Sequence, residues 1–400
     1  MRPWIASDSV RSNRRAFVGA SAAFAVSAAL PARAQVVQPP NGQFLRQLTI
    51  GINVTLSGPF EKYGQEIVRG VQAAVDEANL YSPSALYVWA LRAFDDRNQT
   101  ALAISNVSSA AADPTVVAVI GNLTAPMTLA CLSQYANANF ALVVPAVTAD
   151  AVTRRGFHNV YRLPASDSNA GQLFASAVLP DKKGASCVAV TLDGDYGYDV
   201  ARAFVQQAKT DRHSAEMLLF PQDKTDPAAA ARTVLDRKPD YVFLAGKTSE
   251  LGPVAEACRL AGYTGDFGAS DGFYNTDTIA KYERALDGAY VASSLPPLER
   301  VPSAVYLLND FERKVGQITA FSAYAYGAAQ MIIAAQQRGN ATNRFSFLRT
   351  MQQGGTFTTL VGQYRFNVSG DPLIPDIYFY SVQKDGFKYQ RPAIRTGFVI

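Results

Sequence analysis

The sequence predicts an α/β fold built from two doubly wound, Rossmann-like lobes. Short runs of β-branched and apolar residues alternate with helical patterns of about 10–15 residues, which is typical of βαβ units around a parallel sheet. This alternation stops near Pro145 and starts again at Ser186, so the chain holds two such runs. With 400 residues, the chain also exceeds the roughly 250–300 at which a single hydrophobic core stops growing.

An export signal is expected at the N-terminus, in residues 1–34. Four arginines lead into an apolar, alanine-rich run at 18–30, which is shorter than the roughly 20 residues needed to span a bilayer. Pro31-Ala32-Arg33-Ala34 ends in a small-x-small pattern, so cleavage is expected before Gln35. Residues 35–46 then form a short leader ahead of the first strand.

Two adjacent arginines in this signal resemble the twin-arginine export motif. Arg14-Arg15-Ala16-Phe17-Val18 matches its pattern of Arg-Arg-x-Phe followed by an aliphatic residue. The alternative is an ordinary secretory signal that has two neighbouring arginines. No cysteine follows the apolar run closely enough for a lipid anchor, so we expect a protein released into the periplasm.

The charge balance argues against nucleic acid and anionic membranes as partners. The whole chain carries 37 basic and 33 acidic residues, and the signal accounts for five arginines and one aspartate, which leaves 32 of each. A neutral mature chain has no electrostatic footprint for either partner.

The few cysteines and histidines give no sign of a metal or cofactor site. Cys131, Cys187 and Cys258 lack metal-ligand spacing and lie in apolar patterns, so we expect small core residues. One disulfide remains open as an alternative in the oxidising periplasm. His158 and His213 lie far apart in unlike contexts, which argues against a histidine-based metal or catalytic cluster.

The first run of elements covers residues 48–144. In the first helix, Ile67, Val71 and Ala74 recur at helical spacing, and residues 116–120 form a fully apolar strand. The expected strands are 48–54, 87–94, 116–120 and 141–144. The expected helices are 63–79, 100–112 and 128–137.

The second run covers residues 186–270 and repeats this order. The expected strands are 186–192, 215–220, 241–245 and 267–270. The expected helices are 198–210, 228–236 and 251–261. Because doubly wound sheets bind ligands outside the carboxyl ends of their strands, the loops that follow these strands are where a site is expected.

Two apparent enzyme motifs fail on their context. Gly268-Ala269-Ser270-Asp271-Gly272 matches the G-x-S-x-G pattern of hydrolases, but no histidine follows Ser270 to complete that triad order. Gly246-Lys247-Thr248 resembles the end of a P-loop, but Tyr241 stands where the first glycine of the phosphate cradle is needed. The sequence therefore predicts a binding protein and not an enzyme.

Polar residues follow several of the expected strands. They are 56–59 leading to Tyr63, 122–125, 145–148, 193–197 and Asp271. Helix N-termini offer free N–H groups to a carboxylate, and Asp271 offers a carboxylate to an ammonium group. A zwitterionic α-amino acid would match both.

Five segments follow one another in a characteristic order and spacing, and the first of them contains Leu-Ser-Gly-Pro followed by Tyr-Gly. They are 50–79, 95–96, 145–171, 195–197 and 256–262. Together they resemble the periplasmic Leu/Ile/Val-binding protein family, the type I solute-binding proteins of branched-chain amino acid ABC transporters. The resemblance covers about residues 47–390.

The resemblance implies two lobes joined by a three-segment hinge, as in type I periplasmic binding proteins. It places crossings near Leu163–Pro164, Ser293–Pro297 and Leu360–Tyr364. The implied extents are 47–163 and 296–361 for lobe one, and 164–295 and 362–400 for lobe two.

The resemblance also implies a function. It predicts a monomeric solute-binding component of an ABC transporter, without cofactor, that captures an amino acid or a related small polar or carboxylate ligand in a cleft between the lobes. The ligand would then pass to a permease in the inner membrane. The alternative is a ligand-sensing receptor of the same fold, an amide or organic acid sensor that feeds a regulator.

Five residues carry over from the family's binding positions. Thr148 is expected to hold the ligand carboxylate through its hydroxyl and N–H, and the Val147 carbonyl to accept from the ammonium. Asp271 matches the acidic residue that pairs with the ammonium. Tyr196 is expected to close over the ligand from lobe two, and Tyr63 to flank its side chain.

The sequence departs from the family pattern at two further positions. Ala125 stands where a serine usually binds the carboxylate, so only its N–H remains, with Thr124 or a water as the substitute. Lys247, followed by Thr248, stands where an aromatic residue often contacts the ligand; it either pairs with a distal carboxylate or is solvated. These departures bear on the ligand more than on the fold.

Overall fold

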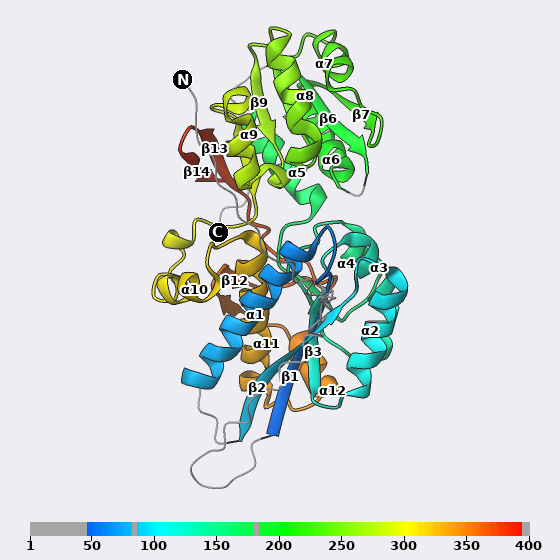
Figure 1. Ribbon diagram of the computed structural model, residues 1–400, viewed down its shortest axis with the longest axis vertical. Helices are drawn as coiled ribbons and strands as arrows, with labels where there is room; N and C mark the ends of the chain where they lie inside the picture. The colour runs from blue at the N-terminus through cyan, green and yellow to red at the C-terminus, as the bar shows by residue number, and fades with distance from the viewer. Residues whose placement is uncertain (1–45, 82–85, 180–183, 195, 394–400) are drawn as a thin grey trace, which may run out of the picture. The chain divides into compact units, whose positions relative to one another are not determined.

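The computed structural model describes residues 46–81, 86–179, 184–194 and 196–393. The expected export signal and residues 35–45 of the leader lie outside the described residues. Two main sheets, each covered by helices on both faces, confirm the predicted α/β class (Figure 1).

The first sheet is five-stranded and all parallel, in the order β2-β1-β3-β4-β5. Its strands are β1 (Arg46–Val54), β2 (Tyr87–Asp95), β3 (Val116–Gly121), β4 (Leu142–Val144) and β5 (Val160–Arg162). Its helices up to β5 are α1 (Glu61–Tyr81), α2 (Thr100–Ala112), α3 (Ala125–Asn137) and the short α4 (Ala151–Arg154). The side chains of α1 pack on one face and those of α2 and α3 on the other, which gives two separate cores. We call this sheet and the helices on it the first lobe.

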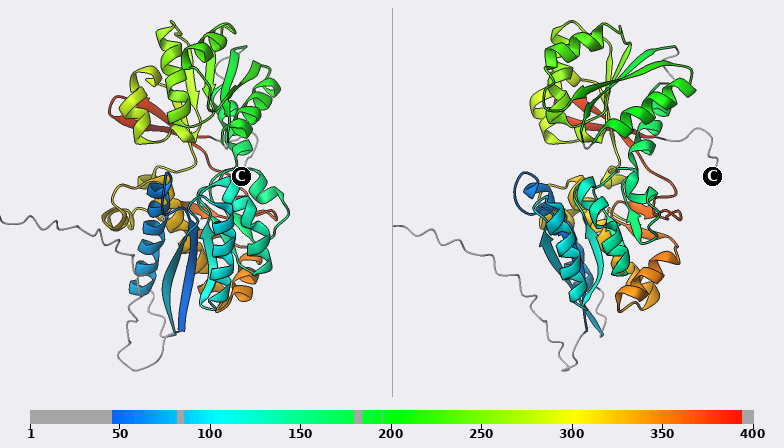
Figure 2. Two further views of the ribbon diagram at one scale, coloured as in Figure 1. Left: turned by 45° about the vertical axis from the view of Figure 1, so that its right-hand side comes forward. Right: turned by 90° about the vertical axis from the view of Figure 1, so that its right-hand side faces the viewer.

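The second sheet has seven strands, in the order β14-β13-β10-β9-β8-β6-β7. Its parallel strands are β6 (Ser186–Asp193), β7 (Ser214–Pro221), β8 (Tyr241–Leu244), β9 (Asp266–Ala269) and β10 (Tyr290–Ser293). The hairpin of β13 (Tyr378–Gln383) and β14 (Gly386–Pro392) adds two antiparallel strands beside β10, drawn in red in Figure 2. We call this sheet and its helices the second lobe.

Five helices cover the second sheet. On one face lie α5 (Asp167–Val178) and α6 (Tyr198–Thr210), and on the other α7 (Pro227–Leu235), α8 (Thr248–Leu260) and α9 (Thr276–Leu286). The stacked rings of Phe204 and Phe243, 4.4 Å apart, join α6 to β8 within the first of these cores.

The chain returns to the first lobe after β10. This part holds α10 (Leu308–Val315), α11 (Ala320–Gly339), α12 (Arg344–Gln352), β11 (Phe357–Thr359) and β12 (Gly362–Tyr364). Helix α11 is buried around most of its circumference and packs against α1 so closely that a Cβ on Gly70 would lie 2.2 Å from the Ser322 carbonyl oxygen. The first-lobe core therefore depends on a segment far from its strands in sequence.

The third crossing between the lobes lies later in the chain than the expected Leu360–Tyr364. Strand β12 still pairs with β11, and Phe366 packs edge-on against Tyr161 of the first lobe at 5.4 Å. Asp371 forms an ion pair with Arg162 at the end of β5. Ile377 is buried in the second-lobe core, so the chain crosses between Asp371 and Ile377.

The three cysteines are buried in the cores, Cys131 in the first lobe and the other two in the second. Burial raises the pKa of the Cys258 thiol to about 11. Within the described part of the chain, no single helix combines the length and apolar composition for crossing a membrane; α10 and α11 reach it only as a pair bent by 117°.

Candidate functional site

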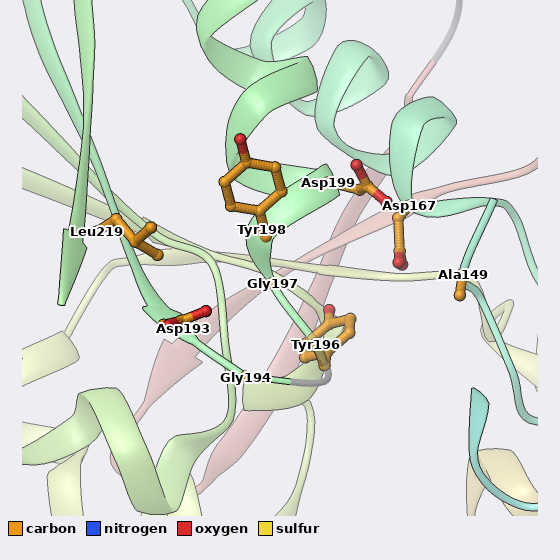
Figure 3. Close-up of a pocket in the computed structure, with 9 residues that line it drawn as sticks. All are labelled: Ala149, Asp167, Asp193, Gly194, Tyr196, Gly197, Tyr198, Asp199 and Leu219. Atoms are coloured by element: carbon orange, nitrogen blue, oxygen red, sulfur yellow. The ribbon is translucent and has the colours of Figure 1, made fainter. Parts of the chain in front are cut away.

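A cavity of about 380 Å³ opens at the carboxyl ends of the second-lobe strands (Figure 3). Its walls come from the loop after β6, the first turns of α5 and α6, β7 and one first-lobe loop residue. The lining residues are Ala149, Asp167, Asp193, Gly194, Tyr196, Gly197, Tyr198, Asp199 and Leu219. The charged side chains among them are all acidic.

The loop from β6 into α6 is held by a close backbone approach at Gly197. Gly197 has a φ of 110°, and a Cβ there would lie 2.2 Å from the Ala245 carbonyl oxygen after β8. Only glycine fits a position with both features. The turn places Tyr196 over the end of the sheet.

Tyr196 and Asp271 meet at this edge. Asp271 begins the short 3₁₀ turn after β9, two strands away from β6 in the sheet, and its carboxylate accepts a hydrogen bond from the Tyr196 hydroxyl. Burial raises the pKa of the Asp271 carboxyl, which the hydrogen bond from Tyr196 partly offsets. Of the predicted site residues only Tyr196 lines the cavity, and Asp271 is joined to it through this hydrogen bond.

Asp167 is a further acidic residue of the site, which the sequence reasoning missed. It begins α5 after the Ser166 cap, the residue is 5% exposed, and its N–H donates to the Thr148 carbonyl at 2.9 Å. The Thr148 side chain lies near its carboxylate and lowers the pKa of that group. The sequence did hold a signal for this helix start, since a serine is a favoured N-cap residue. The Ser166 hydroxyl accepts from the N–H of Asn169, three residues later, at 3.2 Å.

Several groups act on the pKa of Asp167. The pKa is raised to about 7, mainly by burial and also by the negative charges of Asp271 and Asp150, while the Thr148 side chain and the Arg162 charge lower it. Asp167 thus links three of the predicted site residues, since it contacts Thr148 and lies within electrostatic reach of both Asp271 and Tyr196.

The raised pKa of Asp167 predicts a pH-dependent stability. The folded form binds this proton more tightly than the unfolded chain, whose pKa is 3.8, so this group's contribution to stability falls as pH rises from 3.8 to about 7. Asp167→Asn is expected to remove that loss. The check is the difference in melting temperature between the ligand-free wild type and Asp167→Asn, measured across this pH range. A difference that does not change with pH would contradict the raised pKa of Asp167.

The remaining first-lobe residues lie on the loops after β3 and β4 or at the starts of helices α1 and α3. Tyr63 is 39% exposed on α1, with its ring 4.9 Å from that of Phe321. Thr124 caps α3 by position without a side-chain cap bond, and its hydroxyl bonds Asn98 at 3.2 Å. Ala125 is the first residue of α3, and Val147 is buried after β4. Since β3 and β4 are neighbours, the two loops leave the same edge of the sheet.

Lys247 forms an ion pair within its own helix. It lies at the start of α8, and its Nζ is 3.1 Å from Glu250 Oε1, which also accepts from Gln222 at 3.0 Å. The Lys247 side chain is 41% exposed, and the residue is not among those that line the cavity. In the residues that the structure describes, no group of three or more His, Cys, Asp or Glu could hold a metal ion.

Comparison with known proteins gives consistent matches over nearly the whole described chain. The model of the periplasmic binding protein family matches residues 47–387. The Leu/Ile/Val-binding protein BraC3 of Rhizobium johnstonii is 25% identical over 327 residues, which is 81% of this chain and 88% of that protein.

Two solved structures share the fold at low sequence identity. The branched-chain amino acid substrate binding protein LivJ from Streptococcus pneumoniae, in complex with isoleucine, has a TM-score of 0.74 at 22% identity and covers 86% of this chain and 100% of its own. A solute binding protein from R. palustris, in complex with benzoate, has a TM-score of 0.72 at 16% identity and covers 87% of this chain and 96% of its own.

Proposed function

Because the chain belongs to the periplasmic binding protein family, we propose that it is the solute-binding component of an ABC importer for an amino acid or a close analogue. The expected export signal delivers it to the periplasm, where it acts as a monomer. It hands its ligand to a permease in the inner membrane and changes no bond in it.

The observation that supports this ligand class most is a pair of aspartates: Asp167 lines the cavity, and Asp271 is hydrogen-bonded to the lining residue Tyr196. Asp167 and Asp271 repel each other when both are ionised, and burial adds to that cost. A bound ammonium group relieves the repulsion and offers three donors to the two carboxylates and the Val147 carbonyl. The site without ligand therefore carries an electrostatic strain that a cation removes.

The carboxylate end of the ligand is assigned to the first-lobe loops. The first turn of α3 has N–H groups that no Thr124 side-chain cap occupies, and helix N-termini favour anions. Ala125 contributes its N–H, and Thr148 its N–H beside them. The Thr148 side chain, which lowers the pKa of Asp167, would turn to the ligand carboxylate on binding.

The two similar solved structures hold ligands of different classes, and the two aspartates favour one class over the other. The isoleucine of LivJ carries an ammonium group, and the benzoate of the R. palustris protein does not. An aromatic acid without a cation would bring a further negative charge to Asp167 and Asp271. The cavity chemistry therefore favours an amino acid.

A thermal-shift screen tests this function. Purified mature protein is heated with amino acids, amides, dicarboxylates and aromatic acids in turn. A true ligand at 100 times its dissociation constant stabilises the fold by about 2.7 kcal/mol, so at least one amino acid is expected to raise the melting temperature and benzoate is not. A melting temperature that ignores every amino acid while rising with benzoate would contradict the proposed ligand class.

A further inference from the structure

Arg162 is a fully buried cation beside the candidate site. It ends β5, where the chain leaves the first lobe for the first time, and its side chain is 0% exposed. Its Nη1 donates to the carbonyl oxygens of Thr148 at 2.6 Å and Ala149 at 2.7 Å. On its other side, Nε donates to Asp371 Oδ1 at 3.0 Å and Nη2 to Thr153 Oγ1 at 3.0 Å and to Asp371.

We propose that Arg162 is a positioning residue that fixes the Thr148–Ala149 backbone in its ligand-binding conformation, with Asp371 as its counter-ion. This rests on the proposed function, since Thr148 is assigned to the ligand carboxylate there. Arg162 itself touches no ligand.

The geometry of the two carbonyls explains why the loop is fixed. The carbonyls of Thr148 and Ala149 belong to the peptide planes on either side of Ala149, and one nitrogen of Arg162 holds both. The Thr148 carbonyl also accepts from the Asp167 N–H. Because both peptide planes are fixed, the backbone of Thr148, which precedes them in the chain, is fixed as well.

The same fork joins this loop to the third crossing. Asp371 comes just before the chain crosses for the last time, and the Arg162 N–H donates to the Gly370 carbonyl at 2.9 Å. Thr153 closes the cluster, since its hydroxyl bonds both Asp371 oxygens at 3.0 Å. The ligand loop and the starts of two crossings therefore share one ion pair, whose arginine is fully buried.

Arginine is required here because of the number and direction of its donors. A guanidinium places five N–H donors in a planar fork, whereas a lysine is a point charge with three donors on one atom. A lysine at 162 keeps the charge opposite Asp371, but it cannot serve that carboxylate, the Thr153 hydroxyl and two carbonyls together.

The chain offers a matched control in Arg344. Where Arg162 holds two backbone carbonyls, this arginine holds three, those of Val116, Ala111 and Asp113, at 2.7 to 3.0 Å, but in the first lobe away from the cavity lining. Arg344→Lys removes a comparable set of bonds without affecting the ligand loop. It separates positioning from general stability.

The first measurement needs no ligand. The amides of Val152 and Asp167 donate to the Ala149 and Thr148 carbonyls, so their hydrogen exchange reports on the loop. In Arg162→Lys and Asp371→Asn we expect both amides to exchange at least about tenfold faster, with no such change in Arg344→Lys. Unchanged hydrogen exchange of these amides in the two site variants would overturn the proposal. If Arg162→Lys does not fold, Asp371→Asn alone provides the test.

The second measurement uses L-leucine and 3-methylbutylamine, which is leucine without its carboxylate. Calorimetry on wild type, Arg162→Lys and Arg344→Lys gives the affinity ratio of the two probes. We expect the leucine preference to fall at least about tenfold in Arg162→Lys and to stay constant in Arg344→Lys. An equal loss for both probes would overturn the positioning role. If the two site variants exchange faster but the wild type binds neither probe, leucine is ruled out as the ligand and the loop assignment stands; the measurement is then repeated with the amino acid that gives the largest thermal shift and the amine that lacks its carboxylate.

Discussion

Asp271→Asn is expected to weaken binding of the amino acid ligand by about 100-fold, roughly 2.7 kcal/mol. The carboxylate pairs with the ammonium in the proposed complex, and burial makes that charge pair stronger than one in water. Asparagine keeps the shape and still accepts from Tyr196, so the change removes mainly the charge. The check is calorimetry with the amino acid that gives the largest thermal shift.

Asp277→Asn is the matched control for this prediction. Asp277 is an exposed second-lobe aspartate that pairs with Lys281 at 3.0 Å, so its neutralisation leaves the cavity unchanged. Affinity is expected to match the wild type there. An Asp271→Asn protein that binds the amino acid as tightly as Asp277→Asn would remove the ammonium-pairing role and with it the main support for the ligand class.

Gly370→Ala is expected to lower the free energy of unfolding by about 3 kcal/mol or more. Gly370 has a φ of 89°, and a Cβ there would lie 1.8 Å from the Val160 carbonyl oxygen. The backbone must shift to admit the methyl group, which also disturbs the bond from the Arg162 N–H to the Gly370 carbonyl. Denaturant unfolding of wild type and variant measures the loss.

Gly262→Ala isolates the steric part of that loss. Gly262 has a similar φ of 92° but no atom within 4 Å of an added Cβ, so only backbone strain of about 1 kcal/mol is expected. A loss at Gly370 no larger than the loss at Gly262 would mean that the β5 end and the third crossing are not packed as tightly as their carbonyl contact indicates.

The local hydrophobic pattern was sufficient to predict the helices that have one polar face. The predicted helices 100–112 and 198–210 coincide with α2 and α6, because each shows apolar residues at helical spacing and ends at polar residues. Helix α11 was not predicted, although it is central to the first-lobe core. Its buried residues lie all around the helix, so the amphipathic period that marks a surface helix is absent.

The candidate site was predictable in part for a similar reason. Thr148, Tyr196 and Asp271 follow strands, and a doubly wound sheet places such loops at one edge. The rule does not identify Asp167 and Arg162, because both lie around the first crossing between the lobes. Their roles depend on the contacts that they make with the Thr148 loop. Lys247 has a local partner, Glu250, three residues along its helix, as the start of α8 allows.

The amino-acid sequence alone was enough to predict the α/β class, the two βα runs and the loops that could bear a site. These follow from periodicity and composition, which act over a few residues at a time. The folded structure was needed to find where the third crossing lies, that Asp167 lies within electrostatic reach of Asp271, and that Arg162 holds the Thr148 carbonyl while it pairs with Asp371. Such contacts join residues up to about two hundred positions apart, and a buried charge acquires its partner, its pKa and its role only when the fold brings that partner within hydrogen-bond distance.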